Sequence, residues 1–230
     1  KELFAALLQN KNLFVIISVR FLFLLTYTVQ VLNPIFCEYV MGNETIASLL
    51  ALLISVPSIV LSVVLPMLCR RFDKVNMLVV FMVIFAVPSI LQYFLGYESM
   101  AMFLLITTIR AIGYAGFTAL IFMFIPDCIE YGQYTTGQRN AGTSFCLQTF
   151  VSKLNSAVIS SLTAFIIAAM GFSATNVTPE GKSGVWFTYT IFSAIGSIIA
   201  IPILLKFYTL RDKDVKEMIA LYKAAGIRTH

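Results

Sequence analysis

Two basic residues, Arg110 and Lys153, lie deep inside long apolar runs of the sequence. Each is ten residues from the start of its run, which is about 15 Å along a helix. A charge near the centre of a bilayer costs at least about 2.5–3.5 kcal/mol, so such residues normally face a water-filled cavity or a partner charge. Arg20 lies in a third apolar run, where a long side chain can instead extend its guanidinium to the membrane surface.

Polar residues recur at helical spacing around Arg110 and Lys153. Tyr27 follows Arg20 by seven residues, so the two lie on one face of their run. Small polar residues in membranes often only join helices together, but a stripe that contains a mid-membrane cation favours a cavity lining. The two longest stripes are Thr149, Ser152, Lys153, Ser156, Ser160 and Thr163, and Thr107, Arg110, Tyr114 and Thr118.

The composition indicates that the helices carrying these stripes lie in a membrane. The 230 residues are 59% hydrophobic and 12% charged, with a mean hydropathy of +0.90, whereas soluble domains carry about 25% charged residues. Because a span needs about 20 apolar residues, we predict an all-α integral membrane fold, with a six-helix bundle over residues 1–208 and a basic tail over 209–230. The predicted spans lie near 13–36, 46–69, 75–95, 100–125, 143–171 and 185–208.

The basic residues are distributed very unequally between the two sides of these spans. Only Lys182 lies in the loops of one side. Twelve lie on the side of the two termini: Lys1, Lys11, Arg70, Arg71, Lys74, Arg139, Lys206, Arg211, Lys213, Lys216, Lys223 and Arg228. Cytoplasmic segments carry the excess of Lys and Arg, so the sequence predicts a multi-pass protein of the cell membrane with both termini in the cytoplasm. We interpret the basic tail as a contact with anionic lipid and expect no nucleic-acid partner.

The polar stripes also predict which spans face the cavity. The first, second, fourth and fifth carry them, and the third and sixth are expected at the periphery. This three-plus-three pattern is expected for the inverted repeats in one half of a major facilitator transporter. All eleven carboxylates lie at span ends, in loops or in tails, so the buried cations require a counter-charge from a second six-helix half or from an anionic substrate.

The segment after the fourth span carries two carboxylates, Asp127 and Glu130, three residues apart. They share one helical face near a helix C-terminus, where the macrodipole disfavours anions. This placement predicts that cations hold them, as in an ionic lock that can close, although an ordinary solvated loop is the alternative. The four cysteines are widely scattered and the single histidine is terminal, so we expect no metal site, no cofactor and no enzyme.

The order of motifs in this part of the chain resembles that of the glycoside–pentoside–hexuronide:cation symporters, the melibiose-carrier group. They are the acid-x-x-acid-Tyr-Gly of 127–132, the Gly-x-Arg of 137–139 and the Gln-Thr-x-x-x-Lys of 148–153. The resemblance implies spans seven to twelve of a twelve-span transporter that couples uptake of a sugar, glycoside or hexuronide to Na⁺ or H⁺. The coupling cation would then bind mainly to the N-terminal half, which would be this chain's partner.

The resemblance also assigns roles to particular residues. It makes Gln148, Thr149 and Lys153 candidates for the sugar or coupling site, to which the stripes add Arg110, Tyr27 and Tyr114. It makes Asp127, Glu130, Tyr131 and Arg139 candidates for a cytoplasmic gate.

Two departures from the family pattern bear on the substrate. Thr118 stands where the melibiose carriers place an aromatic residue, which removes that stacking partner for a sugar. Arg110 is an additional cation, which with Lys153 raises the hypothesis of an anionic substrate, such as a hexuronide, against a neutral glycoside. A different class of function also remains open: a self-contained six-span protein that acts as a homodimer, or a non-transporting sensor or scaffold on the same fold.

Overall fold

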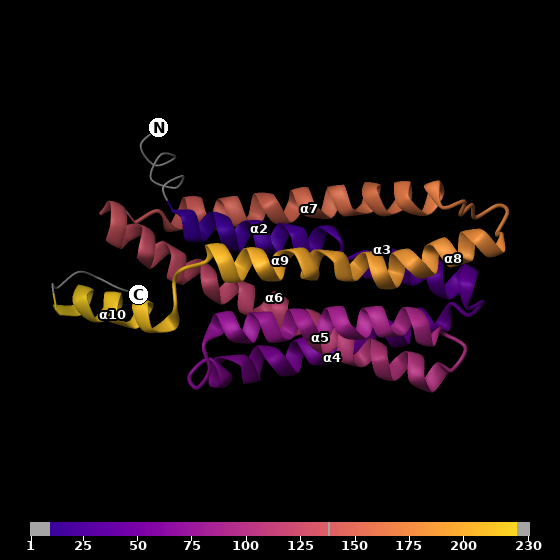
Figure 1. Ribbon diagram of the computed structural model, residues 1–230, viewed down its shortest axis with the longest axis horizontal. Helices are drawn as coiled ribbons and strands as arrows, with labels where there is room; N and C mark the ends of the chain where they lie inside the picture. Colours follow the sequence, from indigo (N-terminus) through magenta and orange to yellow (C-terminus); the bar gives the residue numbers. More distant parts are fainter. Residues whose placement is uncertain (1–9, 138, 225–230) are drawn as a thin grey trace.

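The computed structural model describes residues 10–137 and 139–224, and it is built from helices that run side by side along one long axis (Figure 1). Six of the segments are long and apolar enough to cross a membrane, which confirms the predicted all-α membrane fold. The first consists of α2 (Lys11–Leu25), α3 (Val29–Ile35) and the π-helical turn η1 (Phe36–Val40). The next four are α4 (Thr45–Leu68), α5 (Lys74–Leu95), α6 (Met100–Thr136) and α7 (Ala141–Ala169), and the last joins α8 (Pro179–Phe187), η2 (Thr188–Phe192) and α9 (Ser193–Phe207).

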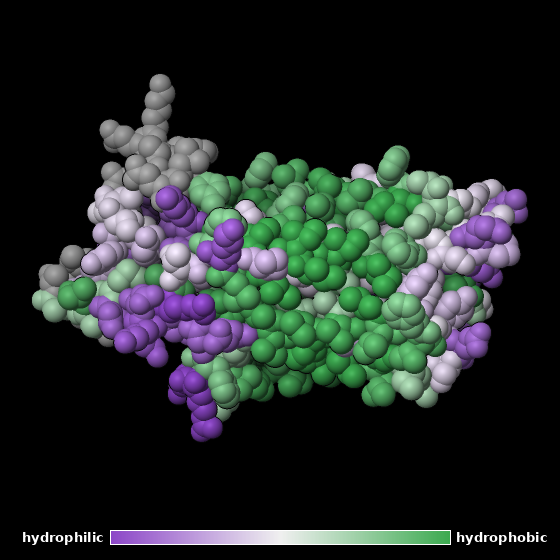
Figure 2. Space-filling view, in the orientation of Figure 1, coloured by the Kyte–Doolittle hydropathy of each residue, from purple (hydrophilic) through white to green (hydrophobic). Residues whose placement is uncertain are grey.

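On the face shown in Figure 2, an apolar band covers the middle of the bundle and separates two polar ends. We call the end where α2 and α5 begin the basic end, because Lys11, Arg70, Arg71 and Lys74 lie there. Within the band, α4 and α7 bury the smallest share of their side chains, and α6 buries the largest. The chain therefore has a packed interior around α6 and two long helices that are mostly uncovered.

The fourth span is longer than the sequence predicts. It continues past Pro126 to Thr136, so most of the segment expected to be a loop is helical. A proline removes one backbone hydrogen bond, but the helix ends only at Gly137, whose φ of +71° is a left-handed conformation that glycine adopts without strain. Asp127 and Glu130 consequently project from a helix.

The predicted tail also contains a helix, α10 (Asp212–Ala224). Its apolar residues Val215, Met218 and Tyr222 recur at three- and four-residue steps and are buried. They pack α10 against the basic end of α6, where the Tyr222 hydroxyl lies 3.4 Å from the carbonyl oxygen of Glu130. The tail is thus a docked amphipathic helix over residues 212–224.

Glycines let α6 approach α5 closely at the centre of the bundle. A Cβ atom on Gly113 would lie 2.8 Å from the carbonyl oxygen of Phe81, and one on Gly116 would collide with the Phe81 ring. Small residues at such contacts allow helix backbones to pack tightly in membranes. The fourth span is therefore fixed against the third, with Phe85 and Phe117 buried beside it.

Candidate functional site

The first span is interrupted at residues 26–28, near the middle of the membrane-length segment, and this break positions Tyr27. The Thr28 hydroxyl donates a 2.7 Å hydrogen bond to the carbonyl of Thr188, and the backbone N–H of Gly196 donates to Thr26 Oγ1 at 3.0 Å. Irregular backbone at membrane depth persists only where protein or a water-filled cavity surrounds it. Broken helices of this kind line the substrate sites of transporters, so the break marks a candidate binding site.

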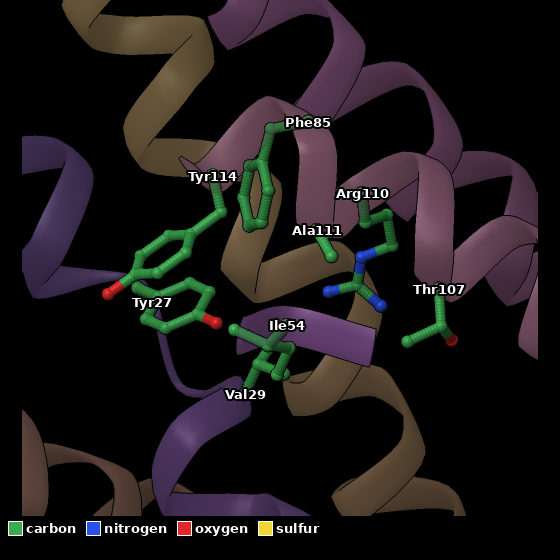
Figure 3. Close-up of a pocket in the computed structure, with 8 residues that line it drawn as sticks. All are labelled: Tyr27, Val29, Ile54, Phe85, Thr107, Arg110, Ala111 and Tyr114. Atoms are coloured by element: carbon green, nitrogen blue, oxygen red, sulfur yellow. The ribbon is translucent and has the colours of Figure 1, made fainter. Parts of the chain in front are cut away.

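Tyr27 stacks on Tyr114 of α6, with ring centroids 3.9 Å apart and an angle of 11° between the rings. Figure 3 shows the two rings side by side, with the Tyr27 hydroxyl directed toward the side where Arg110 lies. The sequence predicted both tyrosines as candidates from helical spacing alone, and the fold brings them together. Together they form a wall that two adjacent cavities share.

The larger of these cavities has a volume of about 350 Å³ and lies between the first span, α4 and α6. Pockets that bind small molecules start at about 300 Å³ and combine apolar walls with a few polar groups. Here the aromatic wall can stack on the face of a sugar, and the side-chain amides of Gln30 and Asn33 can exchange hydrogen bonds with hydroxyl groups. The lining residues are Tyr27, Gln30, Asn33, Pro34, Ala47, Ala51, Ile54, Ser55 and Tyr114.

Gln30 and Asn33 are the residues of this cavity that the sequence analysis missed. Asn33 is 9% exposed, and its Oδ1 has no hydrogen-bond partner in the part of the chain that the structure describes. A buried amide oxygen without a donor costs about 1–3 kcal/mol, so Asn33 is a candidate acceptor for a ligand. Its signal in the sequence was an amide within an apolar run, directly before Pro34.

Arg110 lies in the interior of the bundle, contrary to the expectation that its stripe faces a water-filled cavity. It is 3% exposed and donates to Gln92 Oε1 of α5, to the Tyr189 carbonyl at 3.0 Å and to Ser193 Oγ at 3.1 Å. Its guanidinium also lies 5.6 Å from the ring centroid of Phe85. Neutral acceptors and aromatic rings therefore satisfy this cation without a carboxylate, and they belong to the two spans that the sequence placed at the periphery.

The smaller cavity, beside Arg110, has a volume of about 10 Å³ and is lined by Tyr27, Val29, Ile54, Phe85, Thr107, Arg110, Ala111 and Tyr114 (Figure 3). Such a volume holds about one water molecule. Arg110 thus lines the smaller of the two cavities that share the tyrosine pair, and this cavity is too small for a sugar.

The three candidates on α7 do not line the larger cavity. Lys153 and Thr149 are exposed, and the Thr149 hydroxyl donates to the carbonyl of Phe145 at 2.9 Å. Gln148 is 4% exposed, and its Nε2 lacks a hydrogen-bond partner among residues 10–137 and 139–224. Four residues of the polar stripe of α7 are therefore exposed, and they do not line the cavity of the two tyrosines: Thr149, Lys153, Ser156 and Ser160. Thr163, at the end of the stripe, is fully buried.

The candidate gate residues form ion pairs at the basic end. Lys74, the first residue of α5, pairs with Asp127 and lies 3.2 Å from Asp212 at the start of α10. Arg139 pairs with Glu130 at 3.0 Å, and Glu130 is 6% exposed. The two carboxylates thus use different cations, both from within this chain.

Tyr131, the fourth gate candidate, is half-buried beside α10. It lines a cavity of about 320 Å³ together with Tyr134 and Leu210. We find no contact that joins Tyr131 to the two ion pairs among the residues described in the structure.

Comparison with known proteins shows which family has this arrangement. Residues 1–212 match the family described as MFS/sugar transport protein. The chain belongs to this family. The match confirms the predicted family, whose curated relatives are named as carriers rather than enzymes.

Curated relatives agree at low identity. The chain is 26% identical over 214 residues to the glucuronide carrier protein homolog of Escherichia coli K12, covering 92% of this chain and 47% of the relative. It is 26% identical over 216 residues to a putative sulfoquinovose importer of the same bacterium, covering 91% and 45%. It is 24% identical over 228 residues to the raffinose carrier protein of Pediococcus pentosaceus, covering 95% and 35%. The chain thus spans half or less of the length of these relatives.

Proposed function

We propose that this chain is the C-terminal six-helix half of a secondary active transporter for a sugar or glycoside. In this proposal a second six-helix half completes the binding site, and the two halves alternate access to it from the two sides of the cell membrane. The observation that carries the proposal is the cavity of about 350 Å³ behind the stacked Tyr27 and Tyr114, beside a helix broken at mid-membrane. Membership of the sugar-transport family and the match to about half of each relative support it.

The cavity offers both the apolar and the hydrogen-bonding contacts that a carbohydrate needs. The aromatic wall offers apolar contact to the carbon face of a pyranose ring, while Gln30 and Asn33 offer donors and acceptors to its hydroxyl groups. The exposed stripe of α7, with Thr149 and Lys153, would approach the same sugar or the coupling site across the gap that the second half closes. The Na⁺ or H⁺ that drives uptake would bind mainly to carboxylates of that second half.

The ion pairs at the basic end support a gate. We place this end in the cytoplasm, because the basic residues outside the spans concentrate there. Lys74 with Asp127 and Arg139 with Glu130 would hold the cytoplasmic end of α6 closed while the cavity faces outward. Opening to the cytoplasm then requires these pairs to separate.

A more specific property of the proposed substrate is its charge. Glucuronides and sulfoquinovose are acidic sugars, and raffinose is neutral, so the names of the relatives allow both classes. We favour an acidic sugar, since the glucuronide carrier homolog and the sulfoquinovose importer are named for such substrates.

The test is sugar uptake by the full-length protein in proteoliposomes, with a Na⁺ or a proton gradient imposed separately. We expect uptake of at least one acidic or neutral sugar to exceed that in empty vesicles and to depend on one of the two gradients. The absence of gradient-dependent uptake for every sugar in such a set would contradict transport. Saturable sugar binding without uptake would favour the alternative of a sensor on the same fold.

A further inference from the structure

Arg20 of α2 is a buried cation whose hydrogen-bonding groups are not satisfied. It is 9% exposed, and its Nε and Nη1 atoms lack an acceptor in the part of the chain that the structure describes. The guanidinium lies over the ring of Phe122, 4.7 Å from its centroid. Arg110 differs in this respect, because three acceptors surround it.

The position of Arg20 relates it to the sugar cavity. Phe23 lies three residues after Arg20 on the same face of α2, and its ring centroid is 6.4 Å from that of Tyr114 on α6. Phe122, which contacts the Arg20 guanidinium, follows Tyr114 by eight residues on α6. Arg20 and the tyrosine pair therefore lie along the same contact between the first span and α6, with Arg20 nearer the basic end.

An arginine in this situation needs an oxyanion. Leaving buried N–H groups of a charged side chain unpaired is more costly than leaving a neutral group unpaired, and a planar guanidinium matches the two oxygens of a carboxylate or sulfonate in a bidentate fork. The ion pairs of the described chain involve Asp73, Asp127, Glu130 and Asp212, all at the basic end and none with Arg20. The missing acceptor must come from a ligand or from another chain segment.

We propose that Arg20 binds the carboxylate or sulfonate of an acidic sugar whose ring lies against Tyr27 and Tyr114. This inference rests on the proposed transport function and specifies its substrate class. The sequence suggested Arg110 as a residue that recognises the negative charge. Because Arg110 already has three hydrogen-bond acceptors, we assign this role to Arg20 on the first span. Phe122 contributes by covering one face of the guanidinium, which leaves its edge free to form the fork.

The experiment compares charged and uncharged sugars with the same ring in the full-length protein. Uptake is measured for methyl β-D-glucuronide against methyl β-D-glucoside, and for sulfoquinovose against glucose, in wild type, Arg20→Gln and Arg20→Lys. Lys11→Gln is the matched control, since it removes one positive charge from an exposed position of the same helix. Thermal unfolding of each variant shows whether it is folded.

We expect the wild type to prefer at least one acidic sugar over its uncharged partner. Arg20→Gln should raise the half-saturation concentration for the acidic sugar about tenfold or more, as loss of a hydrogen bond to a charged group implies, and leave the uncharged sugar within about twofold. Arg20→Lys should retain part of the preference, because it keeps the charge but not the fork. Lys11→Gln should behave as wild type.

Three results would overturn the inference. Uptake of uncharged sugars alone by the wild type would show that transport is correct and the acidic substrate is wrong. Equal losses for both sugars in a folded Arg20→Gln protein would assign the oxyanion to a carboxylate of the second half. Unchanged preference in Arg20→Gln would show that Arg20 takes no part in recognition. Absence of all sugar uptake in the wild type would contradict the proposed function itself.

Discussion

The side chains of Arg110 and Gln92 form a hydrogen bond that joins α6 to α5 in the interior of the bundle. Gln92 is fully buried and also donates to the Thr107 hydroxyl at 2.9 Å, so it connects two residues of α6. Replacing it by Leu leaves the Arg110 guanidinium without one acceptor. We expect Gln92→Leu to lower the free energy of unfolding by about 1.5–3 kcal/mol. Thermal unfolding of the purified protein measures this, and Gln30→Leu, the same change at an exposed position, should have little effect.

The close contact at Gly196 predicts a strong effect of a single methyl group. A Cβ atom there would collide with Thr26 Oγ1 and with the carbonyl of Leu22. We expect Gly196→Ala to destabilise the protein by about 1–3 kcal/mol and to displace the break that positions Tyr27. Gly142→Ala adds the same methyl group where no atom lies within 4 Å, so its unfolding temperature should not fall. Equal stability of the two variants would contradict this contact.

The stacked tyrosines predict a difference between removing a ring and removing a hydroxyl. Tyr27→Ala abolishes the stack with Tyr114, which is worth about 0.5–1.5 kcal/mol for an aromatic pair. We expect the half-saturation concentration for sugar to rise about two- to tenfold. Tyr27→Phe keeps the ring and should remain within about twofold of wild type. A larger loss in Tyr27→Phe would mean that the hydroxyl, and not the ring, contacts the sugar.

Lys153 tests whether the exposed stripe of α7 takes part in transport. In the described chain it is exposed and has no ion pair. We expect Lys153→Ala to reduce gradient-driven sugar uptake about tenfold, by loss of one charged hydrogen bond. Lys11→Ala is the control, as an exposed lysine on another helix. Unchanged uptake would remove Lys153 from the site.

Lys74 is expected to hold α10 in place. It pairs with Asp127 of α6 and, through its side chain and its backbone N–H, with Asp212 of α10. In Lys74→Met, hydrogen exchange of the backbone amides in residues 212–224 should accelerate about tenfold, which corresponds to about 1.4 kcal/mol of lost local stability. The control Arg70→Met changes an exposed cation four residues earlier. Unchanged exchange in Lys74→Met would show that apolar packing alone retains the helix.

Much of the fold could be predicted because lipid imposes simple requirements. Spans need about 20 apolar residues, so six helices could be read from the runs. The end of α6 could not, because Pro126 and the charged residues after it are typical of a loop. They remain helical because Lys74 and Arg139, on other segments, pair with Asp127 and Glu130. The spacing of Val215, Met218 and Tyr222 is typical of an amphipathic helix and could have predicted α10. The many charged residues around them favoured a solvated tail instead.

The candidate site was predicted less completely. Tyr27 and Tyr114 followed from helical spacing, but spacing does not give the rotation of a helix about its axis. Arg110 and Tyr114 are four residues apart, yet the first points between α5 and α9 and the second toward the larger cavity. The partner amide Gln92 stood alone in an apolar run, so it carried no periodic signal.

The hydrogen bonds of the helix break have a mechanical consequence. Thr26 and Thr28 are anchored to the last span, through Ser193, Gly196 and Thr188. If α9 tilted by itself, these contacts would be lost where no water can replace them. The ring of Tyr27 must therefore move together with the last span, and in the proposed transport cycle we expect the first and last spans to rock as one rigid unit.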